Sequence, residues 1–359
     1  MTSGFEKNPY EGIDWKKVNF LPGCTHIHCR TQEHFARLVQ EGMRVFTLSN
    51  YYPSAPYYPL REIRENTFRM GQKGYFKEGR YCPDYVDFTK YSGVTDPGKP
   101  LFSGIPDDLI EAPNAEHHWF SDVSIYLHIT APGALLTSGH FDIRDEFGAR
   151  SAGYQLGLPL HWKKGFELHL DSLIYPDGGG IVIAHPQWSH FSTEFICQML
   201  DYDDRVLGIE VVNYGSEQSY TGCCESLWDE ILRTGRRCFG FFVQDHLKEE
   251  PWKGKIILLV DDPSPRAALK AMREGRFYGA VTGEVKFEYV RFDGRRFEAA
   301  CDHEVFFQVI SRRGVEAEHT GMSISFDVPE SQRAQIGYLR LDARYGRRND
   351  KLYTQPVWL

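Results

Sequence analysis

The chain is rich in histidine, and several histidines stand where they could bind a metal ion. Fourteen occur in 359 residues. His26 and His28 end a strand-like stretch, and period-two alternation places both imidazoles on one face. Further candidates follow other apolar stretches: Glu116, His140, His185, Asp245 and His246. Imidazole and carboxylate together suit zinc, manganese or iron, and neighbouring ions need a bridging carboxylate. The joint pattern predicts a site for divalent metal ions.

The elements that must position these side chains alternate between strand and helix. After the strand ending in His28, Thr31 is a suitable helix N-cap and Gly42 a suitable C-cap. Residues 43–49 then form a second expected strand. Strand, helix and strand in this order make a βαβ unit, which predicts a parallel sheet or barrel.

The same rhythm returns in the middle of the chain. We expect strands over 180–186, 207–213, 237–243 and 256–260, with helices over 190–200, 226–233 and 264–273. Several strands end in a titratable or metal-binding side chain. In α/β barrels the carboxyl ends of the parallel strands form the active-site face.

Beyond about residue 280 the helical pattern stops. Strands are expected over 284–292, 296–300, 304–311, 323–328 and 336–343, with a last one ending near Trp358. Turn signals such as Asp293-Gly294 separate them. The predicted organisation is a barrel domain over 1–280 and a β-sandwich-like domain over 281–359.

An aromatic and basic segment at about 51–110 interrupts the barrel pattern and suggests an insertion over the strand ends. Its candidate substrate contacts are Tyr51, Arg61, Arg64 and Arg69, because arginine binds phosphate well. The alternative is an irregular excursion that packs only against its own rings.

Composition narrows the function classes. The net charge of −8 argues against a nucleic-acid partner, which would need a basic surface. We find no run of about 20 apolar residues and no signal peptide, so we expect a cytoplasmic protein without a membrane partner. The eight cysteines are irregularly spaced and are expected to be free thiols. The oligomeric state is left open.

Taken together, these motifs resemble the polymerase-and-histidinol-phosphatase (PHP) family of metal-dependent hydrolases. The resemblance rests on His26-Ile27-His28, Ala184-His185-Pro186, the 208–213 stretch Gly-Ile-Glu-Val-Val-Asn, and Trp228-Asp229-Glu230-Ile231-Leu232 leading to Asp245-His246. It covers most of residues 18–359. It implies a distorted seven-stranded (β/α) barrel with a metal cluster at the strand ends and a β-rich appendage.

The resemblance also implies roles for the candidate ligands. His26 and His28 would bind one ion with a bridging Glu116 and the aspartate of a terminal Asp-x-His motif. A second ion would take Glu116, His140 and His185, with His128 as a rival for His140. The terminal motif departs from the pattern: in Gln244-Asp245-His246, either Gln244 replaces the aspartate or Asp245 is the ligand.

A further departure limits the number of ions. Ser49-Asn50-Tyr51 stands where the family has Thr-Asp-His, and the usual aspartate after the first strand is absent. We therefore expect one or two ions of zinc, manganese or iron.

The predicted function is a metal-dependent hydrolase, most plainly a phosphoesterase that attacks a small anionic, phosphorylated molecule with a metal-activated hydroxide. His246 would be a general acid or a ligand. Glu210 is favoured as the residue that orients a histidine. The alternatives are ester or amide hydrolysis at the same site, or a ligand-binding protein without catalysis.

Overall fold

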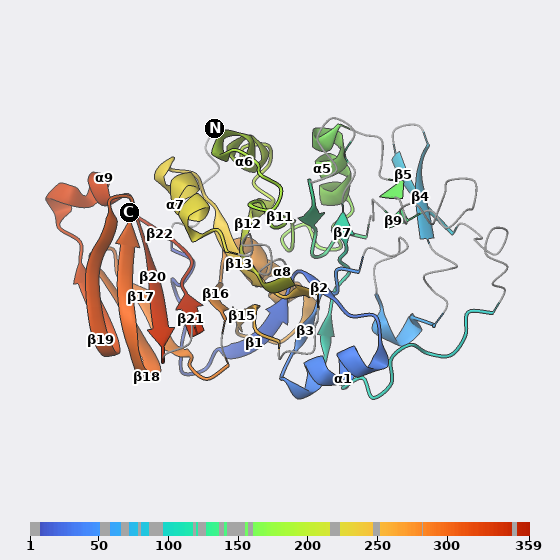
Figure 1. Cartoon of the computed structure of the whole chain (residues 1–359), viewed down its shortest axis with the longest axis horizontal. Coiled ribbons are helices and arrows are strands. Elements are labelled where there is room, and N and C mark those ends of the chain that lie inside the picture. The colour runs from blue at the N-terminus through green and yellow to red at the C-terminus, as the bar shows by residue number, and fades with distance from the viewer. Residues whose placement is uncertain are drawn as a thin grey trace.

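The computed structural model describes residues 8–50, 58–65, 72–77, 80–85, 96–117, 120, 127–135, 140–141, 155–156, 161–215, 223–246, 252–281, 283–346 and 350–359. For 72–77, 80–85, 140–141 and 155–156 only the backbone is considered. The expected insertion therefore lies partly outside the described residues, and Tyr51 and Arg69 lie wholly outside them. The fold is a mixed α/β structure, as the sequence predicts (Figure 1).

Two groups of parallel strands form the part of the fold that carries the candidate ligands. One contains β1 (Asn19–Cys24), β3 (Val45–Phe46) and β6 (Ile110–Glu111). The other contains β11 (Ile181–Ile183), β12 (Val206–Asn213) and β13 (Phe239–Val243). The two groups meet where β2 (Ile27–His28) pairs in parallel with β14 (Asp245–His246). The ends of β1 and β13 are thereby held together.

The second group is extended by antiparallel strands. β8 (Ile129–Thr130) pairs with β11, and β7 (Glu116–His117) pairs with β8. Among the described strands, the pairings do not form one closed ring, so the closed barrel stays a prediction.

Helices cover these strands, and local sequence explains their ends. The expected helices are confirmed as α1 (Gln32–Gln40), α6 (Thr193–Leu200), α7 (Glu225–Arg233) and α8 (Pro265–Glu274). Thr31 Oγ1 accepts a hydrogen bond from the His34 amide, and Gly275 ends α8 with φ of 72°. The sequence analysis missed α5 (Trp162–Asp171).

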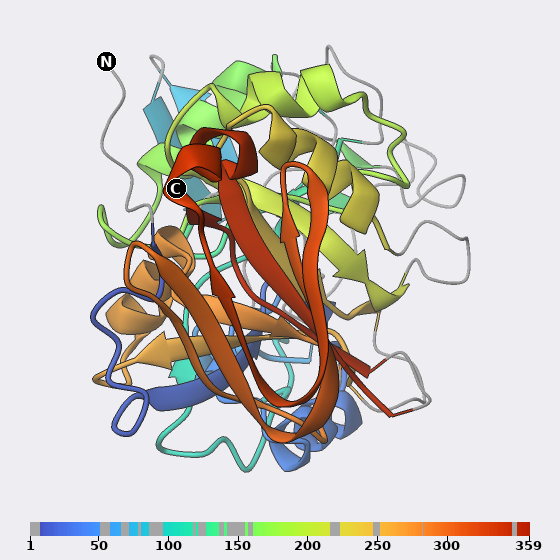
Figure 2. The ribbon, with the colours of Figure 1, turned by 90° about the vertical axis from the view of Figure 1, so that its left-hand side faces the viewer.

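The C-terminal strands extend the same sheet that contains β1. From β1 the sheet passes through β15 (Lys255–Val260), β16 (Phe277–Ala280), β21 (Asp350–Tyr353), β20 (Tyr338–Tyr345) and β18 (Arg296–Ser311) to β17 (Phe287–Phe292). β19 (Gly314–Asp327) pairs with β18, and β22 (Val357–Trp358) with β20. Figure 2 shows these long strands in front of the rest of the molecule.

Some strands differ from the sequence-based expectation, among them β19, which begins at Gly314 rather than near residue 323. β15 runs antiparallel to β1, whereas its position in the strand-helix rhythm suggested a parallel strand. The stretches expected as two strands over 296–300 and 304–311 form the single β18, whose register with β19 shifts between Ala300 and Val305. A bulge keeps the strand continuous where the alternation breaks.

β15 is buried on both faces, because a hydrophobic core lies on each side of it. Ile256 and Leu258 belong to the core around the parallel strands. Ile257 and Leu259 belong to a second core, formed with the inner faces of β17, β18 and β20 and with N-terminal residues such as Trp15. The proposed boundary at residue 280 falls at the end of β16, within the continuous sheet, and remains a prediction.

Short elements complete the described chain. They are the hairpin of β4 (Gln72–Lys77) and β5 (Arg80–Tyr85), the pair β9 (His140–Phe141) and β10 (Gln155–Leu156), the 3-10 turns at Leu60–Glu62 and Glu330–Gln332, and α9 (Arg333–Ile336). The cysteines whose side chains are described are free thiols. Within the described ranges, each helix is too short or too polar to span a bilayer.

Candidate metal centre

The first group of ligand candidates gathers where β2 meets β14. His28 lies in β2, His26 just before it, and Asp245 in β14, with its amide donating to the His26 carbonyl at 2.7 Å. Glu116 reaches the same place from β7. Strand pairing thus brings together residues that are more than 200 positions apart in the chain.

The four side chains converge through four atoms. Nε2 of His26 lies 3.3 Å from Glu116 Oε2 and 3.4 Å from Asp245 Oδ1. Nε2 of His28 lies 3.0 Å and 3.2 Å from the same two oxygens. All four residues are buried, and their ligand atoms lie within 4.8 Å of one another. This is the donor set of a borderline-hard divalent cation.

In the part of the chain that the structure describes, two of these atoms have no hydrogen bond of normal geometry, and this allows a test of whether a cation fits. His26 Nε2 and Asp245 Oδ1 are both buried and, among the described residues, neither makes a hydrogen bond of normal geometry. Unsatisfied polar atoms are costly in a protein interior. A cation between them would satisfy both atoms, so the residues present fit a metal ion.

The second group uses the other oxygen of Glu116. Its Oε1 lies 2.6 Å from His128 Nδ1 and 3.4 Å from His185 Nε2. These three residues also have ligand atoms within 4.8 Å of one another. His128 directly precedes β8, and His185 follows β11. Glu116 is therefore placed to bridge two ions, one on each carboxylate oxygen.

Trp188 borders the second group. Its ring centroid lies 5.4 Å from that of His128 and 5.1 Å from that of His185, with the His185 ring edge-on. The indole is half-buried. It gives this side of the centre an apolar wall, which the sequence analysis did not anticipate.

The charges of the cluster stabilise one another. Burial alone would raise the pKa of Glu116 and of Asp245, but the neighbouring histidines, His26 first, lower both well below their usual values. Burial would likewise lower the pKa of His26 and His185, yet the carboxylates around them raise both. A cation bound here would compete with protons for His26 and His185.

Glu210 orients His26, the role that the sequence analysis favoured. Its Oε1 lies 2.7 Å from His26 Nδ1. A proton on Nδ1 donates to this carboxylate and leaves Nε2, the atom that faces Glu116 and Asp245, with its lone pair. The structure therefore gives Glu210 a supporting position behind a ligand.

The terminal motif divides its three residues among different surroundings. Asp245 faces the first group, whereas Gln244 turns away and its Oε1 accepts from the Lys253 amide at 2.8 Å. The His246 ring stacks on His28 with centroids 4.6 Å apart, and its side chain is 51% exposed. His246 therefore lies beside the first group, at the solvent edge.

The remaining candidates are His140, with its rival His128, and the four residues predicted to contact the substrate. His140 belongs to β9, but its side chain lies outside the described residues, so its predicted role stays a prediction. His128, the rival for that role, lies next to Glu116. Arg61 pairs with Asp107, and Arg64 donates to carbonyls of its own turn. Substrate contacts of Tyr51, Arg61, Arg64 and Arg69 stay predictions.

Asn50 and Ser49 support the backbone next to His28. Asn50 Nδ2 donates to the Cys29 carbonyl at 2.7 Å, and Ser49 Oγ accepts from the Ile27 amide at 2.8 Å. Both residues are buried. They fix the backbone on either side of His28, and the expected number of ions stays a prediction.

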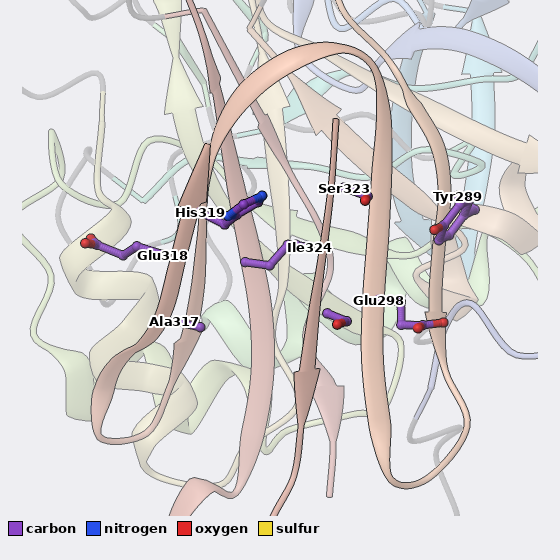
Figure 3. Close-up of a pocket in the computed structure, with 8 residues that line it drawn as sticks. Tyr289, Glu298, Ala317, Glu318, His319, Ser323 and Ile324 are labelled. Atoms are coloured by element: carbon purple, nitrogen blue, oxygen red, sulfur yellow. The ribbon is translucent and has the colours of Figure 1, made fainter. Parts of the chain in front are cut away.

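A separate pocket lies on the C-terminal sheet. It is lined by residues of β17, β18 and β19, including Tyr289, Glu298, Glu318 and His319 (Figure 3). It shares no residue with the two ligand groups, which are the metal-like groups found among the described residues. The metal centre and this pocket are therefore distinct features.

Comparison with known proteins gives one structural likeness. No protein-family model matches the chain, and no curated protein matches it significantly. The chain is similar to the crystal structure of a two-domain protein from Bacteroides vulgatus that contains a predicted PHP-like metal-dependent phosphoesterase. The two are 10% identical, the match covers 99% of this chain and 100% of the other, and the TM-score is 0.44. We therefore derive the function from the geometry of the metal centre.

Proposed function

We propose that this chain is a metal-dependent hydrolase, and specifically a phosphoesterase that acts on a small phosphorylated molecule. The observation that carries the proposal is the position of Glu116. One of its oxygens faces His26, His28 and Asp245, and the other faces His128 and His185. A carboxylate that bridges two such groups suits a pair of divalent ions.

Two ions held there would supply Lewis acidity toward a phosphoryl oxygen and lower the pKa of water. The residues of the chain have separate tasks. His26 and His28 fix the first position, His128 and His185 fix the second, and Glu210 keeps His26 in the binding tautomer. His246, at the solvent edge beside His28, is the residue that we assign to proton transfer with the leaving group.

The charges around the centre bear on how a phosphate substrate would bind. Among the described residues the centre is lined by imidazoles, carboxylates and the Trp188 ring, and Arg61 and Arg64 have partners elsewhere. An anionic phosphate would therefore depend on the ions for charge compensation. Ester or amide hydrolysis would use the same ligands, so a substrate panel must separate these reactions.

The test combines metal content with hydrolysis. The protein is purified without chelator, its metals are measured by elemental analysis, and its activity is measured on p-nitrophenyl phosphate, p-nitrophenyl acetate and a p-nitroanilide. We expect at least one bound transition metal per chain and hydrolysis of the phosphate ester. His28→Ala and Glu116→Ala should lower both.

Matched controls come from the C-terminal sheet. His319→Ala and Glu318→Ala remove the same residue types from exposed positions on β19 and should leave metal content and activity unchanged. Less than one metal per chain in the wild type would favour a ligand-binding protein. Preferential cleavage of the acetate or anilide would favour the alternative hydrolases. Unchanged metal content and phosphate hydrolysis in both site variants would show that the site is wrongly assigned.

A further inference from the structure

Glu210 contacts ligands of both groups. Its carboxylate is completely buried and meets three donors. Oε1 faces His26 Nδ1 at 2.7 Å, while Oε2 accepts from the backbone amide of His185 at 2.8 Å and from Asn213 Nδ2 at 2.9 Å. Since His26 belongs to the first group and His185 to the second, one carboxylate supports both ion positions.

Asn213 connects this carboxylate to a third ligand. The same Nδ2 that donates to Glu210 also donates to Asp245 Oδ2 at 3.1 Å. Both acceptors are carboxylates, so the amide group must present its NH2 end to them. Asn213 is 1% exposed, and its neutral donor lies between two buried acidic groups that would otherwise repel each other.

A β-bulge in β12 makes this arrangement possible. Glu210 and Asn213 are three positions apart, and in a regular strand such residues point to opposite faces. The pairing of β12 with β13 shifts register between Glu210 and Val212, which brings both side chains to the same face. The carbonyls at the shift are used by Cys224, whose amide donates to Val211 and whose thiol donates to Glu210.

The ligands held by this network have unusual backbone conformations. His185 has φ of 26° and Asp245 has φ of 58°, values that side-chain-bearing residues seldom adopt. Such conformations persist only where the surroundings over-determine them. Glu210 holds the amide of His185, and Asn213 holds the carboxylate of Asp245.

We infer that Asn213, placed by the bulge in β12, is a positioning residue for both ion sites. It acts on the first site through Asp245 and on the second through Glu210 and the amide of His185. Removing it should weaken both binding steps, because its side chain donates to the carboxylates of both Glu210 and Asp245. This inference rests on the metal centre of the proposed function.

The experiment is a titration of metal-free protein with Co2+, followed by its visible absorption. In Asn213→Leu we expect both apparent affinities to fall by about 10- to 100-fold, the usual effect of losing a partner behind a metal ligand. The absorption spectrum of bound Co2+ should also change, because the ligands are less well fixed. Asn213→Ser, which keeps one donor, should lose less affinity.

Gln355→Leu is the matched control for a general loss of stability. Gln355 is also a buried amide with two hydrogen bonds, in its case to the backbone of Gly240. It should lower the melting temperature and leave Co2+ binding unchanged. Wild-type affinities and spectrum in Asn213→Leu, or an equal loss in Gln355→Leu, would overturn the inference. A wild type that binds no Co2+ would instead overturn the proposed function.

Discussion

Replacement of Glu210 by glutamine should prevent His26 from binding a cation, although glutamine has nearly the same shape as glutamate. The oxygen of the new amide is needed where Oε2 now accepts from the His185 amide and Asn213. Its NH2 group must then face His26 Nδ1, which lies 2.7 Å from Oε1 in the wild type. A histidine that accepts at Nδ1 carries its proton on Nε2 and cannot bind a cation there.

The size of the effect follows from the loss of one ligand in the first group. Changing the partner behind a metal-bound histidine usually lowers metal affinity by about 10- to 100-fold. Because the wrong tautomer blocks Nε2 directly, we expect the upper end, about 2.7 kcal/mol at roughly 1.36 kcal/mol per tenfold change. The second group keeps the imidazoles of His128 and His185, so its step should weaken less.

Two measurements check this prediction. Zinc affinity is measured by competition with a chromophoric chelator. The tautomer of His26 is measured in metal-free protein by nitrogen-15 NMR of the imidazole ring, at a pH above its raised pKa so that the ring is neutral. Glu210→Gln should move the ring proton of His26 from Nδ1 to Nε2. It should also weaken the zinc-binding step that belongs to the first group by about 100-fold, whether this is the tighter or the weaker of the two steps. A proton that stays on Nδ1 together with wild-type affinity for both ions would refute the reasoning.

Three further predictions concern the same centre. Asp245→Asn should reduce bound zinc, measured by elemental analysis, whereas Gln244→Leu should not, and the reverse pattern would make Gln244 the ligand. His246→Gln should lower kcat while metal content stays at the wild-type level, and lost metal would make His246 a ligand instead. In metal-free protein the raised pKa values of His26 and His185 stabilise the fold below their ordinary value of 6.5, and this stability is lost as pH rises through the raised values. The lowered pKa of Asp245 stabilises the fold above 3.8 and is lost as pH falls. The melting temperature of the metal-free protein, measured by calorimetry, should therefore fall as the pH rises through the raised histidine pKa values, and also as the pH falls below 3.8. A flat profile from about pH 6 to 9 would contradict the histidine shifts.

Local patterns in the sequence were sufficient to propose the first candidate ligands. His26 and His28 follow an apolar strand with period-two spacing, and a strand end is where a parallel arrangement collects functional groups. Glu116 was a candidate from its residue type and position, but its bridging role came only from the resemblance. Capping residues such as Thr31 defined the helices because their effect is confined to neighbouring amides.

The remaining features depend on contacts that no local pattern records. His128 and His140 both follow strand-like stretches, so spacing alone left either one possible. Asp245 and Gln244 differ by one position, and only the three-dimensional structure shows that Asp245 faces the first group while Gln244 accepts from the Lys253 amide. No role was predicted for Asn213, because in a regular strand its side chain would point away from that of Glu210. The bulge becomes visible only through the register of a neighbouring strand.

β15 has a consequence for the modularity of the protein. Since Ile256 and Leu258 face one core while Ile257 and Leu259 face the other, a single strand serves as a wall common to both. A chain truncated after residue 280 would expose the apolar face formed by Ile257 and Leu259 to solvent. An exposed apolar face favours association with other molecules. The part of the chain that carries the candidate metal centre is therefore a poor candidate for a separate domain. The C-terminal strands would have to be kept with it to cover β15.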